Sequence, residues 1–430
     1  MTATANDSRS GRSFRWLVAA QFLGAFNDNL FKQLLLLLAA RWLFPGRDEQ
    51  GIAFAVFALP FLLCSGIAGD LSERFSKRTI IVQMKVAEIG IMLLGAVALQ
   101  LRQWELLLAV LFLMGLQSAV FGPSKYGVIP EIVPHDRLLR ANGLIAMTTF
   151  LAILLGQAVA GPLLDYLPSA LWASGTICTG FAVIGWLCAL RMAPLPAARP
   201  TLRLPRQPFG NLFQTMAGLR RQRHLFTVVL ANSMFWFNGG VLQQAVNGLG
   251  GDRWLAIGAD ENKLLSLLLV TLAASIMLGC MLAPRLARRI AAARLVLGGA
   301  ALMVAAQALL MLVGPVLPRE AGGYLLAHAA LALAGCSGAM FVVPINTYLQ
   351  DAPEPGTKGQ TFAVNNFCNF AGIFVAGGFY ELGSRLDLAP AVTATAGGLL
   401  LLASMAVDRG WLRALGRVNA DETVEPAVAR

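Results

Sequence analysis

The chain has 430 residues, of which 57% are hydrophobic and 13% are charged, and its formal net charge is +11. A soluble protein usually carries about 25% charged residues, so this composition excludes an ordinary soluble domain and indicates a polytopic membrane protein. The basic residues do not form a patch interleaved with aromatic residues, which argues against nucleic acid as a partner.

Apolar stretches long enough to cross a bilayer recur along the whole chain. A helix needs about 20 apolar residues to span a hydrocarbon core of about 30 Å. Most of the 34 Lys and Arg residues fall on one side of these stretches, which predicts cytoplasmic termini. No cleavage site precedes the first span, so we expect it to be retained. The predicted fold is all-α, with twelve transmembrane helices at 16–40, 51–68, 79–100, 105–126, 141–164, 171–191, 225–248, 262–283, 293–314, 321–346, 361–384 and 389–407.

The first span carries a polar cluster in "QFLGAFNDNLFKQLLLLLAA", formed by Asn27, Asp28, Asn29 and Lys32. A charge at bilayer depth costs roughly 2.5–3.5 kcal/mol on insertion scales. Asp28 and Lys32 are spaced i, i+4 and could simply neutralise each other. A salt bridge does not require flanking amides, however. We therefore favour a site in which Asp28, with both asparagines and Lys32, contacts a polar headgroup or a coupling cation.

The loop after the second span, "GDLSERFSKR", is rich in charge. Gly69 is expected to permit close helix approach, while Glu73 and Arg74 lie at helix ends, where ion pairs could hold one conformation. Lys77 and Arg78 follow on the cytoplasmic side. We interpret these five residues as a conformational lock; the alternative is a basic inner loop with incidental acids.

Further polar residues follow on the third, fourth and fifth helices. Lys85 and Glu88 are spaced i, i+3 and are expected to form a structural pair tied to the preceding loop. Lys125 and Tyr126 lie near the cytoplasmic end of the fourth helix, where Lys125 either anchors the helix or meets a substrate phosphate. Asn142 opens the fifth helix as a helix cap or a ligand contact.

A linker divides the chain into two sets of six spans. The segment 191–224 is rich in Pro and Arg, contains no apolar span, and is expected to be cytoplasmic. It separates an N-terminal six-helix bundle at 1–190 from a C-terminal bundle with a short cytoplasmic tail at 225–430.

The two sets of spans show weak internal similarity. "AQFLGAFND" aligns with "ANSMFWFNG", which places Asn27 opposite Asn238. "FGPSKYGVIPEI" aligns with "VVPINTYLQDA", which places Lys125 opposite Asn346. Because both matches join helices of the same number in each half, they indicate two parallel six-helix repeats.

The second half carries amides at mid-depth where the first half carries charge. These amides either hold helix to helix or contact a ligand. Charge in one half and amides in the other suit a ligand with one compact charged end and an apolar tail. The candidates for ligand contact here are Asn238, Gln244, Asn346 and Asn365.

Two levels of family resemblance follow from these motifs. The parallel repeats, the basic linker and the loop from Gly69 to Arg78 resemble the major facilitator superfamily, with Ser76 where a glycine is usual. "QFLGAFNDNLFK", "FGPSKYGVIPEIV" and "RANGLIAMTTFLAILLGQAVAG" resemble the bacterial lysophospholipid transporter family. This resemblance implies movement of a lysophospholipid to the cytoplasmic leaflet of the inner membrane, where an acyltransferase, fused or separate, re-acylates it.

The chain lacks the motifs of an enzyme. His135, His224 and His328 are not followed by an acid at the spacing an acyltransferase needs, so any such enzyme is expected to be a separate partner. The six cysteines form no CxxC pair, and neither a metal site nor an organic cofactor is expected. A coupling cation, either sodium or a proton, is the expected small partner.

Two rival functions fit the same pattern. One is a proton-coupled exporter of amphipathic drugs that uses Asp28 as its proton carrier. The other is a membrane scaffold that presents lipid to an acyltransferase without transporting it. We favour the lysophospholipid transporter, working by rocking of two halves about a central site.

Overall fold

The computed structural model describes residues 2–41, 43, 48–134, 138–197, 200–201, 210–258, 260–351, 358–406 and 410–412. These residues are overwhelmingly helical. The helices are α1 (Thr2–Arg41), α2 (Gln50–Arg74), α3 (Lys77–Leu101), α4 (Trp104–Gly127), α5 (Ile129–Ile132), α6 (Leu138–Tyr166), α7 (Leu171–Leu190), α8 (Gly210–Arg221), α9 (Arg223–Gly248), α10 (Asn262–Ala287), α11 (Ala292–Leu309), η2 (Leu310–Leu312), η3 (Arg319–Ala321), α12 (Gly323–Asp351), α13 (Lys358–Arg385) and α14 (Pro390–Ala406).

Each of the twelve predicted spans coincides with a helix of the described chain. Nine of these helices are long and apolar enough to cross a membrane, and the bent helix α2 makes a tenth if its two segments form one span. The other two predicted spans are α1, which carries the polar cluster, and α14, which has 17 residues. The all-α, multi-span fold class is therefore confirmed.

Helix α1 begins earlier than predicted. The sequence suggests a polar tail before residue 16, whereas the helix starts at Thr2 and runs for 40 residues. Two short helices were also not anticipated. Helix α5 follows directly after α4, and α8 occupies the end of the predicted linker.

The chain divides into two compact units. The first unit comprises Met1–Phe209 and Gly258–Leu267, and the second comprises Gly210–Ile257 and Leu268–Arg430. Helix α8 thus groups with the second six-helix set.

The first turn of α10 groups with the first unit because α6 caps it. Asp165 Oδ1 accepts hydrogen bonds from the backbone N–H and the side-chain amide of Asn262, at 2.8 and 2.9 Å. Asp165 Oδ2 accepts the backbone N–H of Lys263 at 2.8 Å. A carboxylate in this position satisfies amides that an isolated helix start leaves unpaired.

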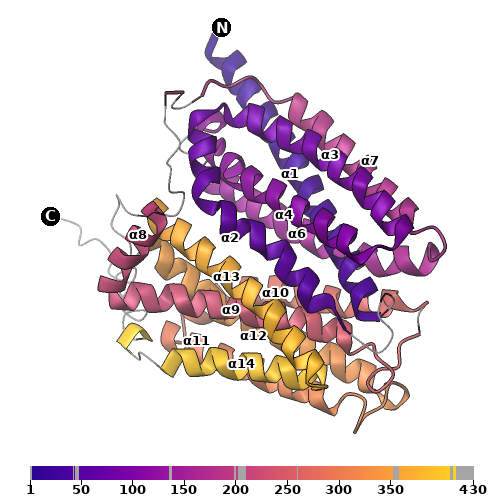
Figure 1. The fold of residues 1–430 in the computed structure, drawn as a ribbon. Coiled ribbons are helices and arrows are strands. Elements are labelled where there is room, and N and C mark those ends of the chain that lie inside the picture. Colours follow the sequence, from indigo (N-terminus) through magenta and orange to yellow (C-terminus); the bar gives the residue numbers. More distant parts are fainter. Residues whose placement is uncertain are drawn as a thin grey trace, which may run out of the picture. The chain divides into compact units, whose positions relative to one another are not determined.

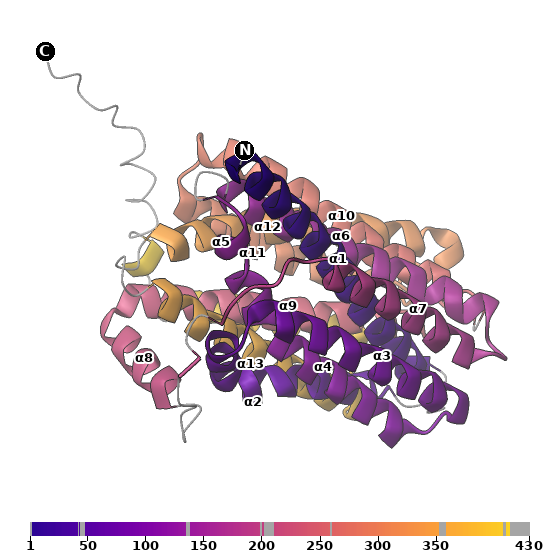
Figure 2. The same ribbon diagram turned by 90° about the horizontal axis from the view of Figure 1, so that it is seen from above.

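Corresponding helices pack alike within the two units (Figures 1 and 2). In the first, α1 packs on α6 and α7, α2 on α4, and α3 on α4 and α7. In the second, α9 packs on α13 and α14, and α11 on α12 and α14. Each of the four second-unit pairings matches one in the first unit, and α10 contacts α12, where Cys336 donates to the Ser275 carbonyl oxygen, as α2 contacts α4. This agrees with the two parallel repeats predicted from sequence.

One crossing shows the repeat at atomic detail. A Cβ placed on Gly156 of α6 would lie 2.6 Å from the Phe26 carbonyl oxygen of α1. A Cβ placed on Gly372 of α13 would lie 2.5 Å from the Ser233 carbonyl oxygen of α9. Small residues let helix backbones approach closely inside a membrane. Both glycines start the small-residue runs "GQAVAG" and "GIFVAGG", so each run provides the same contact in its own unit.

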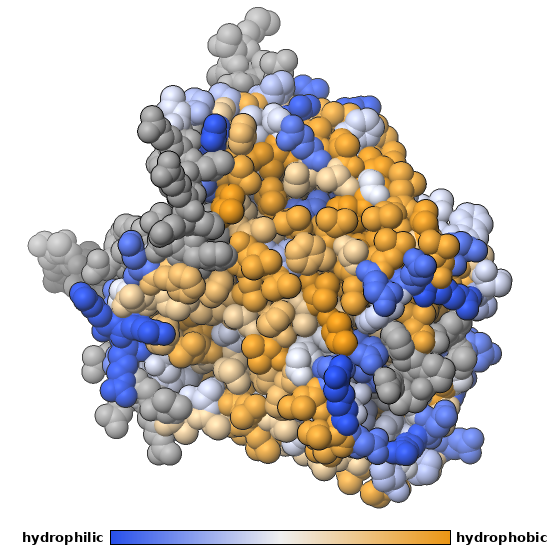
Figure 3. Space-filling view, in the orientation of Figure 1, coloured by the Kyte–Doolittle hydropathy of each residue, from blue (hydrophilic) through white to orange (hydrophobic). Residues whose placement is uncertain are grey.

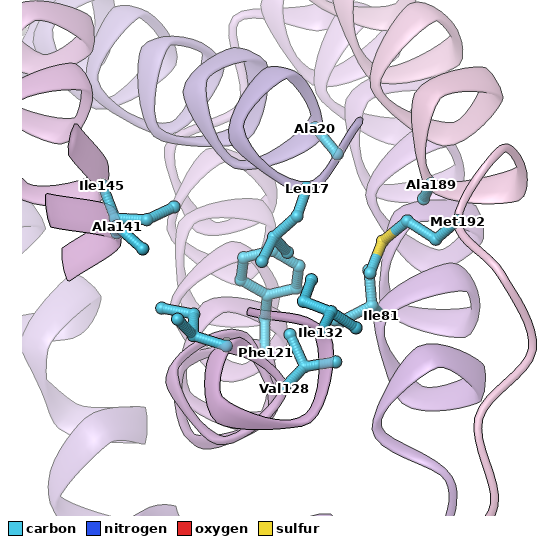
Figure 4. Close-up of a cluster of buried hydrophobic side chains, with 11 residues drawn as sticks. Leu17, Ala20, Ile81, Phe121, Val128, Ile132, Ala141, Ile145, Ala189 and Met192 are labelled. Carbon is cyan, nitrogen blue, oxygen red and sulfur yellow. The ribbon is translucent and has the colours of Figure 1, made fainter. Parts of the chain in front are cut away.

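An apolar cluster fills one end of the first unit (Figure 4). Its side chains come from the middle of α1, the start of α3 and α6, the end of α4, and the end of α7 with the residues that follow it, together with α5. By the predicted topology this is the cytoplasmic end. The buried members are Leu17, Ala20, Ile81, Phe121, Val128, Ile129, Ile132, Ala141, Ile145, Ala189 and Met192.

Apolar side chains also cover much of the surface drawn in Figure 3. On α3, Leu93, Val97 and Leu101 are spaced by four residues and are 53%, 52% and 54% exposed. Residues at this spacing share one helix face. A stripe of large apolar side chains left open in this way fits contact with lipid tails.

Candidate functional site

The polar cluster of α1 faces the interior of the first unit. Asn27 is fully buried, and its Nδ2 donates a hydrogen bond to Glu88 Oε1 of α3 at 3.1 Å. Glu88 Oε2 pairs with Lys85 at 2.6 Å, and both side chains are at most 2% exposed. The predicted Lys85–Glu88 pair is thus present. The pair is held by Asn27 of α1 and not by the loop after α2. This corrects the prediction that the pair is tied to that loop.

Asp28 contacts a different helix from Asn27. Its Oδ2 accepts a hydrogen bond from Ser118 of α4, whose hydroxyl also lies 3.1 Å from Gln117 Oε1. Asp28 Oδ1 is buried and has no hydrogen-bond partner within the described structure. A buried carboxylate oxygen without a donor carries a desolvation penalty. Asp28 therefore holds one acceptor ready for a ligand or a cation.

Lys32 forms no direct ion pair with Asp28 in the described structure. Its ammonium lies 5.5 Å from the ring centre of Phe54 and 5.1 Å from that of Phe57, both on α2. Among the described residues, no ion pair within 4.0 Å joins Lys32 to Asp28. The side chain is only 9% exposed. Two aromatic faces thus hold the ammonium by cation–π attraction, and the self-neutralised couple is not formed.

The third polar residue of the cluster serves its own helix. Asn29 Nδ2 donates to the Ala25 carbonyl oxygen at 2.8 Å. Bonds of this kind satisfy a side-chain amide within the helix that carries it. The contacts that the structure gives Asn29 therefore differ from those of Asn27 and Asp28, which reach across to α3 and α4.

Lys125 and Tyr126 lie at the end of α4. The Lys125 ammonium is 4.6 Å from the ring centre of Tyr126, and Tyr126 is 52% exposed. In the part of the chain that the structure describes, Lys125 has no acidic partner within 4.0 Å. Its ammonium can therefore accept an anionic group from outside the protein.

The loop between α2 and α3 is built around Lys77. Lys77 is 4% exposed and bonds Glu131 of α5 at 2.7 Å, while Glu73 is further away at 3.8 Å. A Cβ on Gly127 would lie 2.8 Å from Lys77 Cε, so the glycine that ends α4 makes room for the lysine stem. Ser76 caps α3 by accepting the N–H of Thr79 at 3.4 Å.

The remaining members of the predicted lock are Gly69, Arg74 and Arg78. Nothing described lies within 4 Å of a Cβ placed on Gly69, so the described residues show no close helix approach at this glycine, and its predicted role stays a prediction. Arg74 stacks on the ring of the adjacent Phe75 at 5.5 Å. Arg78 donates to the Leu190 carbonyl oxygen at the end of α7, at 3.1 Å.

The second-unit amides Asn238 and Gln244 join helices. Asn238 Oδ1 accepts from Gln307 of α11 at 3.0 Å, and its Nδ2 lies 3.5 Å from Met303 Sδ. Gln244 Nε2 donates to the carbonyl oxygens of Gly240 at 3.1 Å and of Ala376, on α13, at 3.5 Å. These bonds fit the helix-joining alternative.

Asn365 belongs to an amide cluster between α9 and α13. Asn232 Nδ2 donates to Asn365 Oδ1 at 3.0 Å and to Asn369 Oδ1 at 3.4 Å. Asn346, the counterpart of Lys125, is exposed on α12. The side chain of Asn142 lies outside the described residues; because α6 begins at Leu138, this asparagine lies within the helix and is not its cap.

Three partners were not chosen from the sequence. Ser118 and Gln117 are polar residues within an apolar span, a signal that could have marked them beside Asp28. Glu131 is an acid just after the fourth span, but nothing in its spacing indicates Lys77 as its partner. In the described residues no group of three or more His, Cys, Asp or Glu side chains could hold a metal ion.

Comparison with known proteins identifies the class first. The model of the Major Facilitator Superfamily matches residues 17–377, and the chain therefore belongs to this superfamily of transporters. Solved structures agree on the fold. A POT family transporter in complex with 5-aminolevulinic acid superposes with a TM-score of 0.72 at 12% identity, covering 94% of this chain and 96% of its own. A bacterial homologue of the human lysosomal transporter Spinster, in an inward-facing and unoccupied conformation, gives 0.63 at 15% identity, covering 96% and 99%.

Sequence relatives then narrow the family. The chain is 30% identical to the lysophospholipid transporter LplT of Cronobacter sakazakii, over 89% of this chain and 91% of the relative. It is 28% identical to LplT of Serratia proteamaculans, over 87% and 89%. Within the superfamily, the chain thus resembles the bacterial lysophospholipid transporters, as the motifs of the first, fourth and fifth helices predict.

Proposed function

We propose that this chain is a secondary transporter that moves lysophospholipids across the bacterial inner membrane to the cytoplasmic leaflet by alternating access. The observation that carries the proposal is Asp28, a carboxylate within an apolar span whose Oδ1 is buried and unpaired while the nearby Lys32 pairs elsewhere. An ionisable group at such a position marks a substrate or ion pathway by default. The names of the LplT relatives support the substrate class.

The charges of the first unit suit a phosphodiester headgroup. Lys32 and Lys125 present ammonium groups without an acidic partner in the described residues. An ammonium is a natural partner for phosphate. Asp28 either receives the polar end of the headgroup or binds a coupling cation, sodium or a proton. Lys125, beside the exposed Tyr126, suits the inner exit of the pathway.

A flux assay with labelled lysophosphatidylethanolamine in proteoliposomes tests this role. Asp28→Asn removes the charge but keeps the size. Loss of a hydrogen bond to a charged group costs about 1.5–3 kcal/mol, so we expect flux to fall by about tenfold to a hundredfold. Asp252→Asn, at an exposed acid of the α9–α10 connection, is the matched control and should transport normally. If Asp28→Asn transports at the wild-type rate, Asp28 is not part of the substrate or ion site.

The same vesicles separate the coupling ions and the rival functions. Flux that depends on a sodium gradient assigns sodium to the site, and flux that depends on a pH gradient assigns the proton. Efflux of amphipathic drugs that ignores lysolipid would select the exporter. Binding to an acyltransferase without any flux would select the scaffold. We expect a separate acyltransferase partner to re-acylate the transported lipid. We also expect both termini of this chain to lie in the cytoplasm.

A further inference from the structure

Helix α8 lies in the basic segment that joins the two six-helix sets, and transport as proposed does not use it. Within the second unit it packs on α9 and α13. Leu219 is 5% exposed, and the ring of Phe213 meets that of Phe367 on α13 edge to face at 6.3 Å. One side of this 12-residue helix is therefore fixed to the unit.

The exposed surface of α8 combines part of an aromatic ring with positive charge. Phe213 remains 55% exposed despite its contact with α13. Arg220 and Arg221 are exposed in the last turn, and neither has an acidic partner within 4.0 Å in the described chain. The segment 210–224 contains no Asp or Glu, so its charge is not compensated locally.

The position of α8 decides which partner this surface fits. Helix α9 begins at Arg223 and is an apolar span, so α8 lies where that span enters the membrane. Amphipathic helices with basic and aromatic residues lie in the interface between headgroups and acyl chains. Basic residues next to a span attract anionic lipids, each contributing about fivefold to binding.

We propose that α8 is a membrane-surface helix that binds anionic phospholipid headgroups through Arg220 and Arg221, with Phe213 at the acyl-chain boundary. The bound lipid is a component of the surrounding leaflet and not the transported molecule. The role therefore does not depend on which substrate the chain carries. It requires that α8 lie at the membrane surface, as the predicted topology places it.

Hydrogen exchange on the full chain in nanodiscs tests this surface. Discs are made of phosphatidylcholine alone or of phosphatidylcholine with phosphatidylglycerol, and exchange is read for peptides covering 210–221. We expect the anionic discs to slow exchange in α8 by about tenfold, and high salt to abolish the difference, because salt screens surface charge. R220Q/R221Q should remove the difference between the two discs.

The α10–α11 connection offers a control with the same change of charge. Arg288 and Arg289 are exposed there, outside any amphipathic helix of the described chain. R288Q/R289Q should leave the α8 response intact. Phe213→Ser should weaken the response while keeping its salt dependence. Unfolding temperature and exchange in α9 verify that each variant folds.

Three results would overturn the proposal. Equal α8 exchange in both discs would show that anionic lipid is not bound there. If R288Q/R289Q also abolished the α8 response, the response would reflect only the general attraction of a basic protein to an anionic surface. Protection by soluble polyglutamate in phosphatidylcholine discs, matching that of anionic discs, would assign α8 to an acidic protein partner. None of these readouts depends on lysolipid flux, so the proposed transport can fail while this inference stands.

Discussion

Asp28 and Asn27 are neighbours in sequence but serve different helices. Consecutive residues in a helix point about 100° apart, so Asn27 reaches Glu88 of α3 while Asp28 reaches Ser118 of α4. The buried Lys85 forms a direct ion pair with Glu88, whereas no lysine of the described residues lies within ion-pair distance of Asp28. Two acids in one bundle thus have different states of pairing, and only the partly paired one is suited to an incoming ligand.

The two buried lysines of this region should differ in how much stability is lost when their charge is removed. Lys85→Met breaks a buried ion pair and leaves Glu88 uncompensated, which should lower the free energy of unfolding by about 3–5 kcal/mol. Lys32→Met removes an ammonium held by two aromatic rings, worth about 0.5–2 kcal/mol, and replaces it with a side chain suited to that apolar site. Thermal unfolding of purified protein measures both. If Lys32→Met lowered the free energy of unfolding as much as Lys85→Met does, Lys32 would have to form an ion pair with Asp28 after all.

At the scale of elements, Lys77 joins three helices at the end of the first unit. It starts α3, bonds α5 through Glu131, and passes the glycine that ends α4. The apolar cluster of Figure 4 includes Ile129 and Ile132 from the same short helix. Helix α5 has four residues, too few to be stable alone. The ion pair and the apolar contacts together therefore hold it in place.

Glu131→Gln should loosen α5 specifically. It leaves the Lys77 ammonium buried without its 2.7 Å carboxylate, and we expect a cost of about 1–3 kcal/mol. Hydrogen exchange of residues 128–134 should rise while exchange in the middle of α3 stays unchanged. Glu73→Gln is the control, because this acid lies 3.8 Å away and its side chain is 42% exposed. If Glu73→Gln loosened α5 equally, the lock would centre on the predicted acid and not on Glu131.

For the whole molecule, sequence patterns predict the parts that depend on hydropathy and composition. Span length gives the helices, and aligned motifs give the two repeats. Side-chain contacts between helices are harder to predict, because they depend on how each helix is rotated about its axis. This is why Asn238 and Gln244 were candidate ligand residues, although Asn238 bonds Gln307 of α11 and Gln244 bonds the Ala376 carbonyl oxygen of α13. Helix α8 was missed because a 12-residue amphipathic stretch within a Pro- and Arg-rich segment carries no span signal.

The repeated crossing gives a prediction for both units at once. Gly156→Val and Gly372→Val each place a branched side chain against a backbone carbonyl oxygen of the neighbouring helix, at sites where even a Cβ would lie 2.6 and 2.5 Å away. Overpacking typically costs about 1–3 kcal/mol, and a rigid backbone neighbour favours the upper end. Both variants should therefore lower the unfolding temperature and the yield of folded protein.

Open glycines supply the control for each unit. Nothing described lies within 4 Å of a Cβ on Gly180 of α7 or on Gly378 of α13. Gly180→Val and Gly378→Val should leave the unfolding temperature within a few degrees of wild type, because they change helix propensity without creating a clash. Equal losses for all four variants would mean that valine disfavours these helices in general. A loss at Gly156 and Gly372 alone shows that both repeats depend on the same close approach, of α6 to α1 in the first unit and of α13 to α9 in the second.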